Sequence, residues 1–375
     1  MSKKRIALGA VIVLILAGIV LGAQQILPMR QTPTPAYFAQ REAAHLTPDE
    51  SRDLRVLQDF LNQGVADFTG YESFPAGMWK YGLAFTAYGL TAMTYIEPGQ
   101  RAAVSSYLDK LILKMKQKVI WEDWIKNGYG DDPVAEHNIM YKGHLNLMYG
   151  LYALVSSDRK WEADFTWLTN NISAEIDASP YCGVTCEPDD YFVQCNSIGI
   201  YSLLMYDRLY GTDHSKQMKS WLNWVKANLI VQPYGVLSKV YHPSKNEVDP
   251  EVSGYGNGWT LAFVHAFDPA FSESLYPAYK QAFIQEQFGF YAFASEKPGG
   301  KPDLMATVFA LLAAKEMGDQ PLFDKLMNAV EKQAPPTVDG NRVSYKGVDK
   351  AGLGLVFFGK INVGLARFLR DEPRD

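Results

Sequence analysis

The sequence predicts an all-α protein built as an (α/α)6 barrel, with six inner helices, six outer helices and an N-terminal arm. Two observations predict this fold. Between residues 80 and 370 a helix-pair theme recurs at intervals of roughly 50 to 60 residues, which is typical of stacked helix pairs. One half of each repeat is apolar and rich in small residues, whereas the other half is amphipathic and charged. Helices that are apolar all round are buried, and helices with one polar face lie outside them.

The apolar halves give the expected inner helices, at 81–90, 143–154, 197–209, 258–266, 305–314 and 352–369. The amphipathic halves give the expected outer helices, at 101–118, 159–176, 214–229, 273–288 and 321–333. The short joints that follow the inner helices contain Gly, Pro, Ser, Thr or Asp, which end one helix or cap the next. Residues 37–70 are expected to form an extra arm or part of the first pair. Residues 235–242 alternate well enough for a short β-hairpin in a rim loop.

The N-terminus has the pattern of a secretory signal or a membrane anchor. Lys3, Lys4 and Arg5 precede an uncharged apolar run over 6–23, and the run is at the lower length limit of a membrane-spanning helix. The basic residues are expected on the cytoplasmic side. We therefore expect a signal or anchor at 1–25, an arm at 26–75 and a barrel at 76–375. The barrel is expected to be exported, either periplasmic or held at the inner membrane through the N-terminal segment alone.

Composition narrows the classes of partner. The 375-residue chain is 47% hydrophobic and has a net charge of −5, which provides no basic surface for nucleic acid. Its 8 Trp, 22 Tyr and 19 Phe residues suit a wide apolar cavity, although aromatic side chains also simply fill cores. The composition therefore favours a small hydrophobic ligand and excludes nucleic acid as the expected partner.

His144 stands alone among Leu and Met residues in one expected inner helix. Met140 precedes it and Met148 follows it by one helical turn, so the imidazole shares a face with two thioethers. One interpretation is a buried neutral His that is hydrogen-bonded to a backbone carbonyl. The other is a base or proton shuttle, because an imidazole titrates near neutrality.

Three cysteines, Cys182, Cys186 and Cys195, lie in the long connection before the third inner helix and at its start. An odd number in an exported protein leaves at least one thiol free or paired between chains. The thiols could be small core residues, zinc ligands together with His144, or acid–base groups.

The same connection carries Glu187, Asp189 and Asp190. Paired carboxylates on an (α/α)6 scaffold could act as a glycosidase acid and base. Most acidic clusters in loops are instead solvated or cap a helix. The residues alone leave both interpretations open.

Three segments, Asn138 to Tyr152, Cys186 to Ser197 and Val252 to Ala262, closely resemble the linalool dehydratase-isomerase family. The resemblance extends thinly from about Tyr37 to the last helix. It implies an (α/α)6 enzyme that removes water from an acyclic monoterpene allylic alcohol, needs no metal or other cofactor, and forms a ring-shaped homopentamer. The family has a structural disulfide, but neither partner is matched here, and one position falls at Gln117.

The resemblance also implies site residues. His144, Cys186, Cys195 and Glu187 match catalytic positions, and the matched or neighbouring positions expected to contact substrate are Tyr81, Met140, Phe192 and Tyr255.

The family further uses an Asp and a Tyr from the arm, and Leu61 stands at that Asp position. Asp59 and Asp67 are the nearest carboxylates, and Asp67 is preferred because Tyr71 is close to it in sequence. Asp67 and Tyr71 therefore complete the expected substrate-binding set.

The leading hypothesis is thus a cofactor-free hydro-lyase, and an allylic isomerase as well, acting on a small allylic alcohol such as linalool. Loss of the hydroxyl group creates carbocation character, which aromatic faces and a dry pocket stabilise. Two alternatives stay open at this point. One is a carbohydrate-active (α/α)6 enzyme, and the other is a non-catalytic envelope protein that binds hydrophobic ligands.

Overall fold

The computed structural model describes residues 45–72, 76–339 and 342–371. The signal or anchor expected at 1–25 and the first part of the arm lie outside these ranges. Within them, no helix combines the length and the hydropathy needed to span a membrane.

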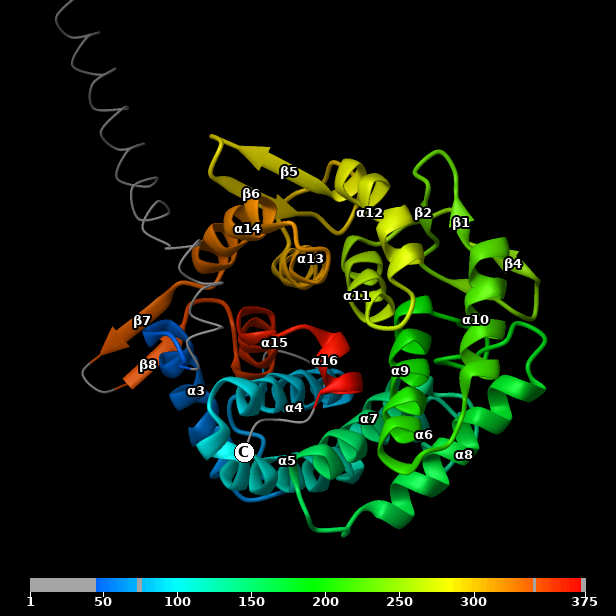
Figure 1. Ribbon diagram of the computed structural model, residues 1–375, viewed down its shortest axis with the longest axis horizontal. Helices are drawn as coiled ribbons and strands as arrows, with labels where there is room; N and C mark the ends of the chain where they lie inside the picture. Colours follow the sequence, from blue (N-terminus) through cyan, green and yellow to red (C-terminus); the bar gives the residue numbers. More distant parts are fainter. Residues whose placement is uncertain (1–44, 73–75, 340–341, 372–375) are drawn as a thin grey trace, which may run out of the picture.

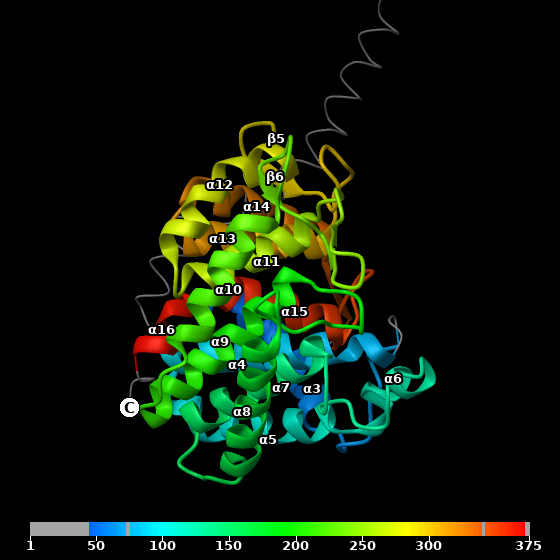
Figure 2. The ribbon, with the colours of Figure 1, turned by 90° about the vertical axis from the view of Figure 1, so that its right-hand side faces the viewer.

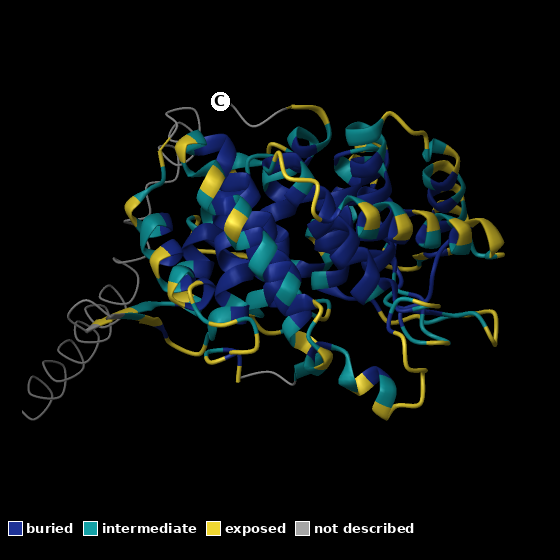
Figure 3. Cartoon of the chain, turned by 90° about the horizontal axis from the view of Figure 1, so that it is seen from below, coloured by how far each residue is buried: buried dark blue, intermediate teal, exposed yellow. Residues whose placement is uncertain are grey.

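A ring of buried helices forms the inner layer of the molecule (Figure 1). Its members are α4 (Trp79–Ile96), α7 (Ile139–Val155), α9 (Val193–Tyr210), α11 (Gly254–His265), α13 (Leu304–Glu316) and α15 (Lys350–Ile361). Apolar and small side chains cover almost the whole circumference of these helices, so each can be enclosed by neighbours. Figure 3 shows buried residues through the interior and exposed residues confined to the periphery.

The outer layer consists of amphipathic helices that cover the inner ring. They are α3 (Pro48–Leu61), α5 (Arg101–Met115), α8 (Glu162–Ala178), α10 (Ser215–Asn228), α12 (Pro269–Phe283) and α14 (Gln320–Gln333). The (α/α)6 barrel expected from the sequence is confirmed. The arm helix α3 packs beside α15, and the buried Lys360 ammonium lies 3.0 Å from Asp53 of α3.

Side-chain caps begin many of these helices. The caps that accept a hydrogen bond from a backbone N–H of the first turn are Thr47, Ser253, Asp268, Asp303, Asp319 and Asp349. Such a cap satisfies an N–H group that has no partner inside the helix. The caps of α11, α13 and α15 lie at the rim where the candidate site is found.

The last expected inner helix, at 352–369, is divided in two. Helix α15 ends at Ile361, and α16 (Leu365–Arg370) starts after Gly364, whose φ is 99°. Helix α16 then packs across one end of the barrel, where the Tyr201 hydroxyl donates to the Leu365 carbonyl at 2.7 Å. Figure 2 shows α16 and the short helix α6 (Glu122–Lys126) at opposite ends of the barrel.

Short antiparallel hairpins decorate the connections. They pair β1 (Ile230–Val231) with β2 (Val236–Leu237), β3 (Tyr241–His242) with β4 (Glu247–Val248), β5 (Ile284–Gln287) with β6 (Tyr291–Ala294), and β7 (Pro336–Asp339) with β8 (Arg342–Tyr345). The expected outer helix at 273–288 is therefore shorter, because α12 ends at Phe283 and the chain continues as β5. Three 3-10 turns, Ala76–Met78, Pro98–Gln100 and Lys118–Ile120, complete the described elements.

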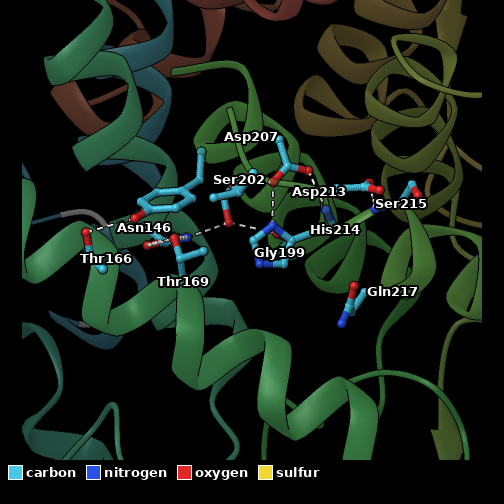
Figure 4. A network of polar contacts seen from close by, with 12 residues as sticks. Asn146, Thr166, Thr169, Gly199, Ser202, Asp207, Asp213, His214, Ser215 and Gln217 are labelled. Atoms are coloured by element: carbon cyan, nitrogen blue, oxygen red, sulfur yellow. Dashed lines mark hydrogen bonds and ion pairs between the residues drawn. The ribbon is translucent and has the colours of Figure 1, made fainter. Parts of the chain in front are cut away.

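Buried polar contacts hold neighbouring helix pairs together (Figure 4). The Asn146 amide of α7 donates to Ser202 of α9 at 2.9 Å and to Thr169 of α8 at 3.1 Å. The Ser202 hydroxyl in turn donates to the Gly199 carbonyl at 2.7 Å. A fully paired network of this kind fixes one arrangement of the helices, because any other would leave polar groups buried without partners.

Candidate active site

The inner helices point their N-terminal ends toward one rim of the barrel, and the candidate site lies there. The first two turns contribute Lys80 and Tyr81 from α4, Met140 and His144 from α7, Cys195 from α9, and Tyr255 and Trp259 from α11. Helix N-termini carry partial positive charge and favour negative charge near them. The rim is therefore suited to chemistry in which a thiolate or another anion forms transiently.

His144 is fully buried. Its Nδ1 atom lies 2.6 Å from the Tyr88 hydroxyl, whereas its Nε2 atom has no hydrogen-bond partner among the described residues. Burial, reinforced by the positive charge of Lys80, lowers the pKa of His144 to about 3. The imidazole is consequently neutral at neutral pH. This differs from the proton-shuttle interpretation of the sequence, which assumed that the imidazole titrates near neutrality.

Aromatic rings enclose this imidazole. Tyr81 and Phe85 present their rings edge-on to it, with centroid distances of 5.5 Å and 5.7 Å. The Trp259 centroid is 5.3 Å away, and Trp259 stacks on Phe309 at 4.8 Å. The result is a dry, electron-rich wall around a single unpaired ring nitrogen.

Cys186 and Cys195 are both free and buried, and they lie near enough to interact electrostatically. Burial raises the pKa of Cys186 most, the neighbouring Cys195 thiol raises it further, and the Phe192 backbone lowers it. Cys182 is free and only partly buried. The structure thus brings together the two thiols that the sequence singled out and leaves the third nearer the surface.

Hydrogen bonds hold the loop between these thiols in one shape. The Cys186 N–H donates to the Asp190 carbonyl at 2.7 Å. The Asn196 side chain bonds both backbone groups of Val184, at 2.8 Å and 2.9 Å. Tyr191 exchanges a pair of backbone hydrogen bonds with Tyr241 in β3. The hairpin β3–β4 is therefore hydrogen-bonded to the Cys186 loop and helps to fix its conformation.

Asp189 and Asp190 belong to this support. The Ser244 N–H and hydroxyl both donate to Asp189 at 2.7 Å, and Asp190 lies 3.0 Å from His242. Both carboxylates thus bind the hairpin, which agrees with the structural interpretation of the acidic cluster. The backbone of Asp190 also closes a tight turn with Glu187, at 3.0 Å.

Glu187 and Lys80 face the same small cavity of about 70 Å³, whose wall also includes Met140 and Asp123. Burial raises the pKa of Glu187, although the nearby Lys80 ammonium lowers it in part. Burial likewise lowers the pKa of Lys80, against the opposing effect of Glu187 and the two thiols. The buried Lys80 and the partly buried Glu187 are therefore oppositely charged groups that lie near the thiol pair.

A second cavity of about 280 Å³ opens at the same rim. It is mostly apolar, and its wall is formed by Met78, Tyr81, Gly82, Phe85, Asp303, Leu304, Met305, Gly347, Ala351, Gly352 and Leu355. Tyr81 joins this cavity to the catalytic candidates, because its ring contacts His144 and its pKa is raised by burial and by Cys195 and Cys186. The larger cavity is thus a candidate site for a hydrocarbon group.

Both thiols act electrostatically on Tyr255. Burial first, then Glu296 and the thiols, raise its pKa. Its backbone N–H donates to the Glu296 carboxylate at 3.2 Å, which fixes the start of α11. Within the described residues, no group of three His, Cys, Asp or Glu side chains is arranged to hold a metal ion.

Comparison with known proteins decides the family. The sequence model of the linalool dehydratase/isomerase family matches residues 80–351, which is well over half of the chain. This chain belongs to the linalool dehydratase/isomerase family. The match covers every inner helix at least in part and includes His144 and both buried thiols.

Solved structures share the fold at low identity. The α-1,6-mannanase GH76A of Salegentibacter sp. HEL1_6 is 13% identical, with 89% of this chain and 100% of that chain covered and a TM-score of 0.51. A family 105 glycoside hydrolase of C. acetobutylicum ATCC 824 is 12% identical, with 84% and 99% covered and a TM-score of 0.53. At such identities the likeness concerns the barrel alone.

Two arm residues, Asp67 and Tyr71, were expected to complete the site, but no described contact joins them to the thiols. Asp67 is exposed and accepts a hydrogen bond from the Thr69 N–H at 2.9 Å. Tyr71 is buried and stacks on Phe60 at 4.4 Å. Asp59 is exposed on α3. The described contacts bring none of these three to His144, so their roles stay predictions.

Three residues of this family member enter the site without having been singled out by sequence. Tyr88 follows Tyr81 by two helical turns and Trp259 follows Tyr255 by one, so helical spacing could have placed each on the face of its predecessor. Lys80 had a different signal, a charge at the start of an otherwise apolar helix. Such spacings are frequent among aromatic-rich inner helices. Which of these residues reach the site therefore depends on which helix faces meet in the closed barrel.

Proposed function

We propose that this chain is a cofactor-free hydro-lyase that removes water from a small allylic terpene alcohol such as linalool. The observation that carries the proposal is the pair of buried thiols, Cys186 and Cys195, which share Tyr81 as a neighbour with the buried His144 and with an apolar cavity of about 280 Å³. The family match supports a dehydratase or isomerase of this general type.

The chemistry needs a proton for the leaving hydroxyl group and an acceptor for a proton from the adjacent carbon. A thiol can fill both roles in sequence. It gives its proton to the hydroxyl oxygen as the carbon–oxygen bond breaks, and the thiolate then takes the proton from the neighbouring carbon. Water and an alkene form, and the thiol is restored. Cys186 and Cys195 act as a pair in this proposal, with Glu187 at the polar side.

His144 contributes as a neutral group, because its pKa of about 3 prevents it from being the imidazolium acid at neutral pH. Its free Nε2 atom is available to the substrate or to a thiol, and the Tyr88 hydroxyl orients the ring. The rings of Tyr81 and Trp259 provide faces that stabilise developing positive charge on the allylic carbons. Delocalisation of that charge also permits allylic isomerisation.

The test is to incubate purified protein with linalool, geraniol and short alkenols and to measure alkenes in the headspace. We expect alkene release from at least one allylic alcohol and no cleavage of a panel of glycosides. Glycoside cleavage would favour a carbohydrate-active enzyme of the same fold. Tight binding of the alcohols without turnover would favour a non-catalytic ligand-binding protein.

We also propose that the chain is exported and assembles into a homo-oligomer, a pentamer by resemblance to the family. Cell fractionation tests the first proposal, and light scattering on the purified protein tests the second. Recovery of the protein with the cytoplasmic fraction, or a monomeric mass, would contradict the respective proposal.

A further inference from the structure

Lys80 is an unusual residue for its position. It is only 8% exposed at the second position of α4, and it is followed by a run of apolar and aromatic side chains. Among the residues that the structure describes, its ammonium group has no ion-pair or hydrogen-bond partner. The Nζ atom instead lies 5.5 Å from the centre of the Tyr81 ring.

An ammonium group that is shielded from most of the surrounding water and has no protein partner is costly, because charge is strongly stabilised by water. The groups that face Lys80 are Glu187, Cys195, Cys186 and Asp123, and all of them oppose the lowering of its pKa by burial. A chain that only needed packing here would gain from an apolar residue. The charge is therefore better explained by a ligand that supplies the missing hydrogen bonds.

The cavity beside Lys80 has the size for such a group. Its volume of about 70 Å³ exceeds the roughly 10–15 Å³ that one enclosed water needs in the same measure, so a hydroxyl group and a water molecule fit. Glu187 offers a hydrogen-bond acceptor in the same wall, and Lys80 offers donors. The charged side of the cavity, formed by Lys80, Asp123 and Glu187, thus matches an oxygen-bearing group, while side chains such as Trp121 and Met140 form an apolar part of its wall.

Each cavity is bordered by a residue on which the thiol pair acts. The thiols act electrostatically on Lys80, which borders the small cavity, and on Tyr81, which borders the large apolar one. A molecule with a hydrocarbon tail and one hydroxyl group would place its tail against Tyr81. Its carbon–oxygen bond would then lie at the thiols, with its oxygen toward Lys80.

We propose that Lys80 binds the hydroxyl oxygen of the substrate and then the water released from it, in the cavity that it shares with Glu187. This inference rests on the proposed dehydration. Lys80 stays protonated throughout: a thiol supplies the proton that leaves with the oxygen, the ammonium donates a hydrogen bond to that oxygen, and its charge stabilises the transient thiolate. Lys80 is thereby the residue that distinguishes an alcohol from the alkene product.

The test compares the binding of two ligands with one carbon skeleton, linalool and the triene formed from it by loss of water. Titration calorimetry is performed on the wild-type protein, Lys80→Met, Lys80→Arg and the control Lys118→Met. Lys118 is exposed in the 3-10 turn Lys118–Ile120, so its variant removes one positive charge without entering either cavity.

We expect the wild-type protein and Lys118→Met to prefer the alcohol. Lys80→Met should lose this preference by about 10- to 100-fold while its affinity for the triene is unchanged, because a hydrogen bond from a charged donor is lost. Lys80→Arg should retain part of the preference. The melting temperature of Lys80→Met should be equal to or higher than that of the wild type, because a buried charge is removed.

Two results would overturn the inference: an alcohol preference that survives in Lys80→Met, or a wild-type protein that binds the alcohol no more tightly than the triene. Both readouts use binding and do not require turnover. A wild-type protein that prefers the alcohol through Lys80 but releases no alkene would refute the proposed dehydration while leaving the assignment of Lys80 in place.

Discussion

At the scale of single residues, burial controls the chemistry of the site. His144, Glu187, Lys80 and Cys186 all have pKa values moved by desolvation in the direction that favours their neutral forms. Glu187 and Cys186 therefore hold their protons more tightly than they would in water, whereas His144 and Lys80 hold theirs less tightly. The partial positive charge of the helix N-termini then favours the anionic form of whichever group releases its proton.

His144 makes this effect measurable. Its pKa is about 3 in the folded protein and about 6.5 in an unfolded chain. Between these values the unfolded chain binds a proton that the folded protein does not, so lowering the pH favours unfolding. The free energy of unfolding should therefore fall by roughly 1 kcal/mol for each pH unit from about pH 6.5 toward pH 3 through this residue alone.

The measurement is urea unfolding at several pH values for the wild type and for His144→Gln, which keeps a partner for the Tyr88 hydroxyl. Glu187, whose pKa is raised, acts in the opposite direction, and the comparison of the two proteins removes its contribution. The difference in stability between wild type and variant should narrow or reverse as the pH falls. Parallel curves would contradict the buried neutral imidazole.

At the scale of elements, the arm helix α3 is joined to the barrel by buried charge. Asp53 and Lys360 are both fully enclosed and lie 3.0 Å apart, and the Tyr345 hydroxyl donates to Asp53. Although burial lowers the pKa of Lys360, Asp53 and Glu331 raise it overall. The arm is thus fastened to α15, the helix whose start borders the large cavity.

Asp53→Leu alone should destabilise the protein by about 3–5 kcal/mol, because it removes one of the two carboxylates, Asp53 and Glu331, that pair with a buried ammonium. The double variant Asp53→Leu with Lys360→Met should recover most of this loss, since replacing both charges by apolar groups is often neutral. Chemical denaturation of both single variants and the double variant measures the coupling. Additive losses would show that the two side chains do not act as a pair.

Close approach of helices α4 and α15 depends on small residues. A Cβ atom at Gly82 would lie 2.6 Å from the Ala351 backbone. Gly82→Ala should therefore cost about 1–3 kcal/mol by overpacking. Gly99→Ala is the matched control, because no atom lies within 4 Å of the position of its Cβ, and it should be close to neutral. Equal melting temperatures for the two variants would contradict this packing.

Sequence periodicity predicted the repeated helix pairs because buried inner helices are apolar all round, whereas outer helices keep one polar face. It left open whether the arm forms a separate element or part of the first helix pair, and it did not place the arm helix beside α15, since that contact joins the two ends of the chain. The break at Gly364 was also missed, because the apolar pattern continues through it into α16. For the site, the local motifs gave His144 and the thiols, whereas Lys80 and Trp259 depend on which helix faces meet in the closed barrel.

At the scale of the whole molecule, the two ends of the barrel differ: one is covered by α16, and the other carries the candidate site. Helix α16 packs across one end through the Tyr201 and Arg208 side chains, while the N-termini of the inner helices gather the candidate site at the other. The likeness to glycoside hydrolases concerns the fold alone. The identity of the reaction must therefore be decided by the side chains placed there.

The central claim is that the Cys186–Cys195 pair carries the dehydration, and alkene release from linalool tests it most directly. The measurement compares headspace alkene formed by the wild type, Cys186→Ala, Cys195→Ala and Cys182→Ala, each checked for an unchanged melting temperature. We expect the first two variants to lose at least about 100-fold in rate, as removal of an acid–base group does, and Cys182→Ala to stay near the wild-type rate. Near-normal rates for Cys186→Ala and Cys195→Ala, or a severe loss in Cys182→Ala alone, would contradict the account.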